Sequence, residues 1–190
     1  MSGASYSESV SLYFEDYRKG VELADQIGIS VFCGAELSYK GTDFLVYGLD
    51  EAWYLSHPEI MDMKKSEELP YLINSGALVV QAHPFREARY IDHIRLFPGG
   101  VQGIEIYNAN RTAKENKMAK LYAELYGFIP FAGTDNHISS EQRKFGAVRS
   151  DKRISDEREF VSLALARELE PVMIDLDENI FSTIKFGKEN

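Results

Sequence analysis

The chain is poor in several features that mark particular protein classes. Its 190 residues include a single cysteine, Cys33, which excludes an internal disulfide and favours the reducing cytoplasm. We interpret Cys33 as packed core and not as a nucleophile, because the apolar run at residues 29–33 disfavours the thiolate. No apolar run reaches the roughly 20 residues that a membrane-spanning helix needs, and no basic, apolar secretory leader opens the chain. We therefore expect a cytoplasmic protein without membrane segments.

Basic residues are also scarce. The 21 lysines and arginines stand against 30 aspartates and glutamates, for a net charge of −9. Such a chain lacks the broad basic surface with which proteins hold nucleic acid, so we expect no nucleic-acid partner. A small anionic substrate stays open, because bound metal cations can reverse the local field inside an acidic protein.

The remaining composition is that of a globular domain. Hydrophobic residues make up 44% and charged residues 27% of the chain, which allows a substantial core. The length suits a single domain over residues 1–190. We find no repeat, low-complexity segment or linker.

Helical and strand patterns alternate along the chain. Apolar residues recur at helical spacing from Val10 to Ala24, with Ser5 and Glu8 as a capping box and Gly28 as the stop. Further helices are expected from Ser56, over residues 66–74, from Thr112 to Gly127 and around residues 160–164. Strands are expected at residues 29–33, 44–47, 77–82, 101–107, 128–132, 147–148 and 171–174.

Near-continuous apolar strands between helices predict parallel pairing, with helices covering the sheet. Polar residues of the kind that bind metals follow these strands again and again. They are Glu36, His83, Asn108, Asp135 and His137. Because sites in barrels and open parallel sheets form at the carboxyl ends of strands, we expect these side chains to share one site.

The residue types suggest a metal. In an extended segment Asp135 and His137 would point to the same side, and their oxygen and nitrogen donors suit zinc, manganese or iron. Pro84 favours an extended His83 that projects from its strand, and the carboxylate of Glu36 could bridge two cations. Each of these residues also allows a purely structural interpretation. Residues 135–137 could form a turn, His83 could be a buried, hydrogen-bonded histidine, and Glu36 could be a solvated charge or a helix cap.

Taken together, the segments 34–38, 82–86, 103–108 and 133–137 resemble the PHP family of polymerase and histidinol phosphatase domains. The resemblance extends over about residues 13–148, in the family's order. It implies a distorted TIM-like barrel of the (βα)7 type with a cluster of two or three metal ions. Glu36 would bridge two metals, and His83, Asp135 and His137 would be ligands.

Members of this family commonly hydrolyse phosphate esters, so the resemblance implies a small phosphorylated substrate. Arg86 is a candidate phosphate clamp, because a guanidinium matches phosphate oxygens bidentately; otherwise it is a surface arginine. Asn108 could line the pocket or hydrogen-bond its own loop. We interpret Asp43 and Glu105 as structural or solvated.

The sequence departs from the family at its beginning. The family opens with a His-x-His pair, whereas no histidine precedes His57 here. We therefore expect a barrel that is incomplete at the N-terminus, as a shortened reading frame would produce, with weakened metal binding. The strand containing Val31 would have an open edge, covered by a second subunit of a homo-oligomer or by rearranged N-terminal residues.

Three functions stay open. The first is a metal-dependent phosphoesterase, which Arg86 beside His83 favours. The second is a non-catalytic binding or assembly module, which the missing histidine pair favours. The third is a metal hydrolase of amides or lactones, since similar ligands serve that chemistry.

Overall fold

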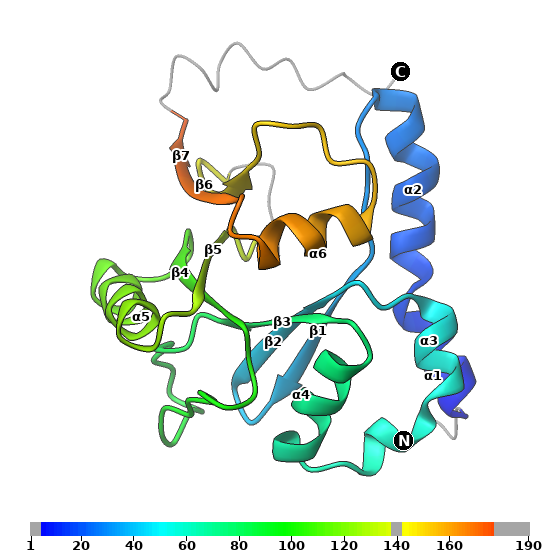
Figure 1. Ribbon diagram of the computed structural model, residues 1–190, viewed down its shortest axis with the longest axis horizontal. Coiled ribbons are helices and arrows are strands. Elements are labelled where there is room, and N and C mark those ends of the chain that lie inside the picture. The colour runs from blue at the N-terminus through cyan, green and yellow to red at the C-terminus, as the bar shows by residue number, and fades with distance from the viewer. Residues whose placement is uncertain (1–4, 138–141, 177–190) are drawn as a thin grey trace.

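The computed structural model describes residues 5–137 and 142–176, in which seven strands form two sheets (Figure 1). The larger sheet has the order β1-β2-β3-β4-β5, and β6 and β7 form a separate pair. The strands are β1 (Gly34–Tyr39), β2 (Thr42–Tyr47), β3 (Leu78–Ala82), β4 (Gly103–Asn108), β5 (Ile129–Gly133), β6 (Lys144–Arg149) and β7 (Glu170–Asp175). The helices are α1 (Tyr6–Tyr13), α2 (Glu15–Ile27), α3 (Glu51–Ser56), the 3₁₀ helix η1 (Pro58–Asp62), α4 (Lys65–Asn74), α5 (Ala113–Tyr126) and α6 (Glu157–Leu165).

The larger sheet is mixed. β1, β2 and β3 pair antiparallel, whereas β3, β4 and β5 pair parallel. Lys40 and Gly41 alone connect β1 to β2, with φ of 51° and 80°. Positive φ at both central residues is typical of a type I′ hairpin turn, and a two-residue turn can join only antiparallel strands.

The predicted (βα)7 barrel is therefore wrong. In the described part of the chain, the five-stranded sheet is open and β6–β7 form a second sheet instead of continuing it. The expectation of parallel pairing holds only from β3 to β5. Apolar strand patterns indicate burial on both faces and leave the direction of pairing undetermined, which is why the error arose in the hairpin.

Most local predictions are confirmed, with three exceptions. Ser56 does not start a helix: it is the last residue of α3, and the 3₁₀ helix η1 follows with His57 at its N-cap position. The predicted strand at residues 29–33 is not a strand, and β1 begins at Gly34, so Glu36 lies inside a strand and not after one. The helix expected from Val10 to Ala24 is two helices that meet at Phe14. The capping box of Ser5 and the left-handed end at Gly28 are as predicted.

Apolar layers cover both faces of the larger sheet. On one face Phe44, Val79 and Ile104 pack with residues of α4 and α5. On the other face Val80 and Phe131 pack with residues of α6. Figure 1 shows α4 and α6 on opposite sides of the sheet. The two layers explain why apolar residues occupy both faces of these strands.

Cys33 is buried against the first layer, as predicted. Burial raises the pKa of its thiol to about 11, and the nearby carboxylate of Glu157 adds to the rise. None of the helices in residues 5–137 and 142–176 combines the length and apolar character that crossing a membrane requires.

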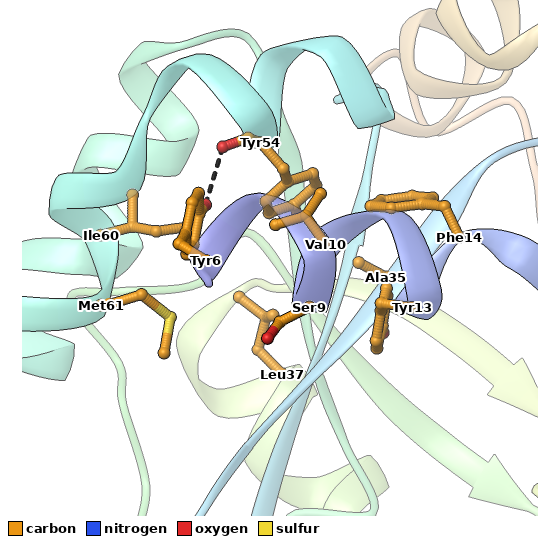
Figure 2. Close-up of a pocket in the computed structure, with 10 residues that line it drawn as sticks. All are labelled: Tyr6, Ser9, Val10, Tyr13, Phe14, Ala35, Leu37, Tyr54, Ile60 and Met61. Carbon is orange, nitrogen blue, oxygen red and sulfur yellow. Dashed lines mark hydrogen bonds between the residues drawn. The ribbon is translucent and has the colours of Figure 1, made fainter. Parts of the chain in front are cut away.

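The outer strand β1 is covered in part by the N-terminal helix. The hydroxyl of Tyr13 donates to the carbonyl oxygen of Glu36 at 3.2 Å and accepts from its N–H at 2.8 Å. An apolar cavity of about 440 Å³, lined by Val10 and Leu37 among others, separates α1 from the strand (Figure 2). The hydroxyl of Tyr6 crosses one end of it to the carbonyl oxygen of Tyr54. Tyr13 therefore supplies the hydrogen bonds that a neighbouring strand would give to Glu36.

Candidate metal centre

Three side chains, carried in or next to three neighbouring strands, meet at one end of the larger sheet. Glu36 lies in β1, Asp43 in β2, and His83 directly after β3. Their ligand atoms all lie within 4.8 Å of one another. Two carboxylates and an imidazole provide oxygen and nitrogen donors of the kind that divalent cations use.

Asp43 is a member of this group that the sequence interpretation missed. It is 7% exposed, so it is not a solvated charge. It pairs with Ser38 in the β1–β2 register, and Ser38 and Glu36 share a face because side chains alternate along a strand. A two-residue turn recognised at Lys40 and Gly41 would have placed Asp43 beside Glu36.

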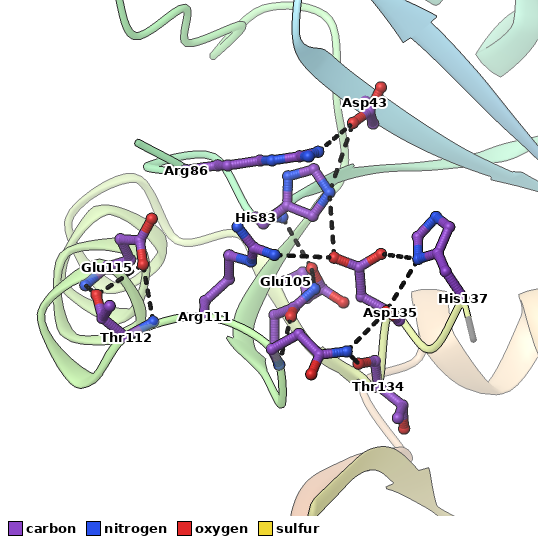
Figure 3. Close-up of polar contacts among 12 residues, drawn as sticks. Asp43, His83, Arg86, Glu105, Arg111, Thr112, Glu115, Thr134, Asp135 and His137 are labelled. Carbon is purple, nitrogen blue, oxygen red and sulfur yellow. Dashed lines mark hydrogen bonds and ion pairs between the residues drawn. The ribbon is translucent and has the colours of Figure 1, made fainter. Parts of the chain in front are cut away.

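His83 is the centre of the site. Its Nε2 lies 3.5 Å from Oδ2 of Asp43 and 3.9 Å from Oδ2 of Asp135 (Figure 3). Its buried Nδ1 has no hydrogen-bond partner among the described residues. Burial lowers the pKa of His83, although both aspartates act to raise it. The neutral imidazole that results is the form that binds metals.

Asp135 adjoins His83, whereas His137 lies outside the three-residue group. Asp135 has a φ of 54°, so the extended geometry assumed for residues 135–137 does not hold. The Nδ1 of His137 lies 3.3 Å from Oδ1 of Asp135 and 3.1 Å from its carbonyl oxygen, with 73% of the side chain exposed. The structure thus brings Glu36, His83 and Asp135 to one place and leaves His137 at its rim, where its role as a ligand stays a prediction.

Two arginines lie beside the aspartates that face His83. Nη1 of Arg86 lies 3.4 Å from Oδ2 of Asp43, and Nη2 of Arg111 lies 3.8 Å from Oδ2 of Asp135. In Figure 3 dashed lines link Arg86 to Asp43, Asp43 to His83, His83 to Asp135 and Asp135 to Arg111. The Nε of each arginine is buried without a hydrogen-bond partner in the part of the chain that the structure describes.

Arg111 was not identified from the sequence. It lies in the loop between Asn108 and the helix cap at Thr112, and nothing in its local pattern separates it from an ordinary surface arginine. Both arginines line a groove of about 530 Å³. Its other lining residues are Asn110, Asp135, Asn136, His137 and Gln142. The groove is large enough for a small-molecule ligand.

Asn108 and Glu105 lie behind the ligands. Asn108 is 1% exposed; its Oδ1 accepts from the Asn110 N–H, and its Nδ2 donates to Glu105. Its side chain is thus engaged in its own loop, the second of the two sequence interpretations. Burial raises the pKa of Glu105 to about 7, against the lowering effect of its hydrogen bonds to Asn108 and to the His83 N–H.

The site concentrates negative charge. Burial raises the pKa of Glu36, and the carboxylates of Asp43 and Asp135 raise it further, while His137 and Arg86 act to lower it. Burial and the two neighbouring carboxylates thus both disfavour the charged form of Glu36. The residues present fit a divalent cation by their donor atoms and their spacing.

Comparisons with known proteins bear on the fold. Neither a protein-family profile nor a curated protein matches the chain. A two-domain protein from Bacteroides vulgatus that contains a predicted PHP-like metal-dependent phosphoesterase superposes with a TM-score of 0.63 at 15% identity, over 84% of this chain and 49% of that one. This chain thus spans about half the length of that protein.

A second structure, a candidate metal-dependent phosphoesterase from Bifidobacterium adolescentis, superposes with a TM-score of 0.53 at 11% identity, over 87% of this chain and 84% of that one. At these identities the two likenesses show a shared fold and no more. What this chain does has to be argued from its own site.

Proposed function

We propose that the chain is a hydrolase of phosphate esters that depends on a divalent metal, with zinc, manganese and iron as the candidate cations. One observation carries the proposal: Glu36, Asp43 and His83 present ligand atoms within 4.8 Å of one another, beside a groove that Arg86 and Arg111 line. The fold supports it, because the chain shares that fold with a protein that contains a predicted PHP-like metal-dependent phosphoesterase and with a candidate metal-dependent phosphoesterase.

Glu36, Asp43 and His83 would hold the cation, with Asp135 on the far side of His83 Nε2. A bound cation in such a site lowers the pKa of a water molecule and neutralises charge on phosphoryl oxygens. The hydrogen bonds from Tyr13 to the backbone of Glu36 hold the β1 side of the group in place.

Arg86 and Arg111 would bind the phosphoryl oxygens. Each now lies beside one of the two aspartates that face His83. With a cation held beside Asp43 and Asp135, both guanidinium groups would be free to bind an anion between them. An amide or a lactone offers no negative charge to two such groups, so this arrangement favours a phosphate ester over those substrates.

The first experiment measures metal binding and turnover on the same chain. We expect the protein, stripped with EDTA, to bind Mn²⁺ or Zn²⁺ in calorimetry and then to hydrolyse p-nitrophenyl phosphate. His83→Ala and Asp43→Asn should each weaken metal binding by at least tenfold, because each removes a ligand. Metal binding that is absent in the wild type, or unchanged in both variants, refutes the proposed site.

The second experiment tests the arginines. Arg86→Gln and Arg111→Gln should each raise KM for p-nitrophenyl phosphate by about 10-fold or more, as loss of a charged hydrogen bond of about 1.5–3 kcal/mol predicts. Arg89→Gln is the matched control, since Arg89 is exposed near Arg86 and does not line the groove. Equal effects of all three substitutions would indicate a general charge effect and contradict the assignment. Faster hydrolysis of p-nitrophenyl acetate or a p-nitroanilide would favour the other substrate classes.

A further inference from the structure

Glu105 connects the ends of three strands beneath the metal site. It lies in β4 and is 3% exposed. Its Oε2 accepts the backbone N–H of His83, which follows β3, at 2.8 Å, and the Nδ2 of Asn108, at the end of β4, at 3.1 Å. One carboxylate oxygen therefore ties the end of β3 to the end of β4.

The other carboxylate oxygen meets the end of β5. A Cβ added to Gly133, the last residue of β5, would overlap Oε1 of Glu105, closer than real Cβ contacts occur. A side chain at position 133 would therefore force the Glu105 carboxylate to move. The β4–β5 pairing also shifts register between Glu105 and Tyr107, and such a bulge turns the strand and redirects nearby side chains. Asp135 follows two residues after Gly133.

The residues that these strand ends deliver have unusual backbones. His83 has a φ of 27° and Asp135 a φ of 54°. A non-glycine residue in this region costs on the order of 1–3 kcal/mol and persists only where surrounding contacts enforce it. For His83 the enforcing contact at its N–H is the buried hydrogen bond to Glu105.

We propose that Glu105 is a positioning residue that sets the His83 imidazole against Asp43 and Asp135 through the strand ends it joins. It is not itself a member of the three-residue ligand group. Its effect on a metal rests on the proposed function, whereas its effect on the His83 backbone does not. The same side chain leaves no room for a Cβ at position 133 in the arrangement observed.

The test compares Glu105→Gln and Glu105→Leu with Glu115→Leu. Glu115 is a matched control, because it is also a buried carboxylate that accepts backbone N–H groups, those of Glu87 and Thr112, away from the ligands. We expect Glu105→Leu to weaken Mn²⁺ binding by about 10- to 100-fold, the usual range for loss of a residue that orients a ligand. Glu105→Gln should stay within about threefold, because its amide oxygen can accept both bonds.

Equal losses of Mn²⁺ affinity in Glu105→Leu and Glu115→Leu would mean that Glu105 acts only through the overall stability of the protein, and would overturn the proposal. So would an unchanged affinity in a folded Glu105→Leu. The His83 amide signal in nitrogen-15 spectra of the metal-free protein supplies a readout that needs no metal. It should move upfield in Glu105→Gln, which keeps the shape of the side chain and weakens the hydrogen bond.

An unmoved His83 amide signal in Glu105→Gln overturns the proposal, whatever the metal affinities are. If the wild-type protein binds no metal while the signal moves as expected, the proposed function fails and the positioning role stands. The two results are therefore distinguishable.

Discussion

Replacing Gly146 with alanine should destabilise the protein and disturb the metal site together. Gly146 lies in β6, directly against the end of β5. An added Cβ would overlap the carbonyl oxygen of Gly133 and lie 2.6 Å and 2.7 Å from its backbone carbon and nitrogen. No rotamer change can relieve a clash with backbone, so β6 must move away from β5.

The magnitude follows from what that movement breaks. Overpacking in a close-packed region costs about 1–3 kcal/mol. The hydroxyl of Thr134 donates to the Gly146 carbonyl oxygen at 3.0 Å and accepts from its N–H at 3.1 Å. Two lost hydrogen bonds add about 1 kcal/mol each. The sum, about 3–5 kcal/mol, is a large part of the roughly 5–15 kcal/mol that holds a domain folded.

Urea unfolding of Gly146→Ala and Gly99→Ala measures the effect. Gly99 is the control, because its added Cβ would meet nothing within 4 Å and its φ is not positive. We expect the free energy of unfolding to fall by about 3 kcal/mol or more in Gly146→Ala and to change by less than about 1 kcal/mol in Gly99→Ala. Since Thr134 precedes Asp135, Mn²⁺ affinity should fall as well. Equal unfolding free energies for the two variants would refute the packing argument.

Three further predictions concern α2, Cys33 and the outer edge. Gly20→Ala should raise the free energy of unfolding by about 0.5–1 kcal/mol, because Gly20 lies inside α2 and its added Cβ would make only an ordinary contact with Val31. A lower free energy of unfolding in urea would contradict this. At pH 8 an aromatic disulfide reagent should label Cys33 at least about 100-fold more slowly in the folded protein than in urea. Burial raises the pKa of the thiol from 9.0 to about 11, and the thiolate is the reactive form. Equal labelling rates would show an accessible thiolate and contradict the prediction. We propose that the outer edge supports a homo-oligomer to which the exposed apolar residues of α1 and α2 contribute; Leu12, Leu23 and Ile27 are at least 59% exposed. Light scattering should show a mass above the monomer that falls in Leu12→Ser/Ile27→Ser, and a wild-type monomer would refute it.

Local structure was predictable where a few neighbouring residues determine it. The capping boxes at Ser5 and Thr112 and the helix ends at Gly28 and Gly127 are as the sequence indicates. Each depends on one side chain that bonds a nearby N–H, or on one glycine that adopts a left-handed conformation. The break between α1 and α2 at Phe14 was missed, because helical spacing of apolar residues continues across it.

Local sequence patterns of this kind could not predict the direction or the register of the strands. An apolar run reports that both faces of a strand are buried, and antiparallel β2 and parallel β4 look alike in that respect. The barrel prediction failed for this reason. Asp43 was missed for a related one, since its place beside Glu36 depends on the turn at Lys40 and Gly41 and not on any motif.

By itself, the sequence indicated that Glu36, His83 and Asp135 share one place, because each follows or lies in a predicted strand; their role as ligands stays a proposal. Only the tertiary structure decided which of the candidate side chains face one another. It added Asp43 and Arg111 through cross-strand register and loop placement, and it turned His137 toward Asp135 through a single left-handed residue. Contacts between residues far apart in the chain depend on backbone geometry summed over whole strands, and no short segment of sequence contains that information.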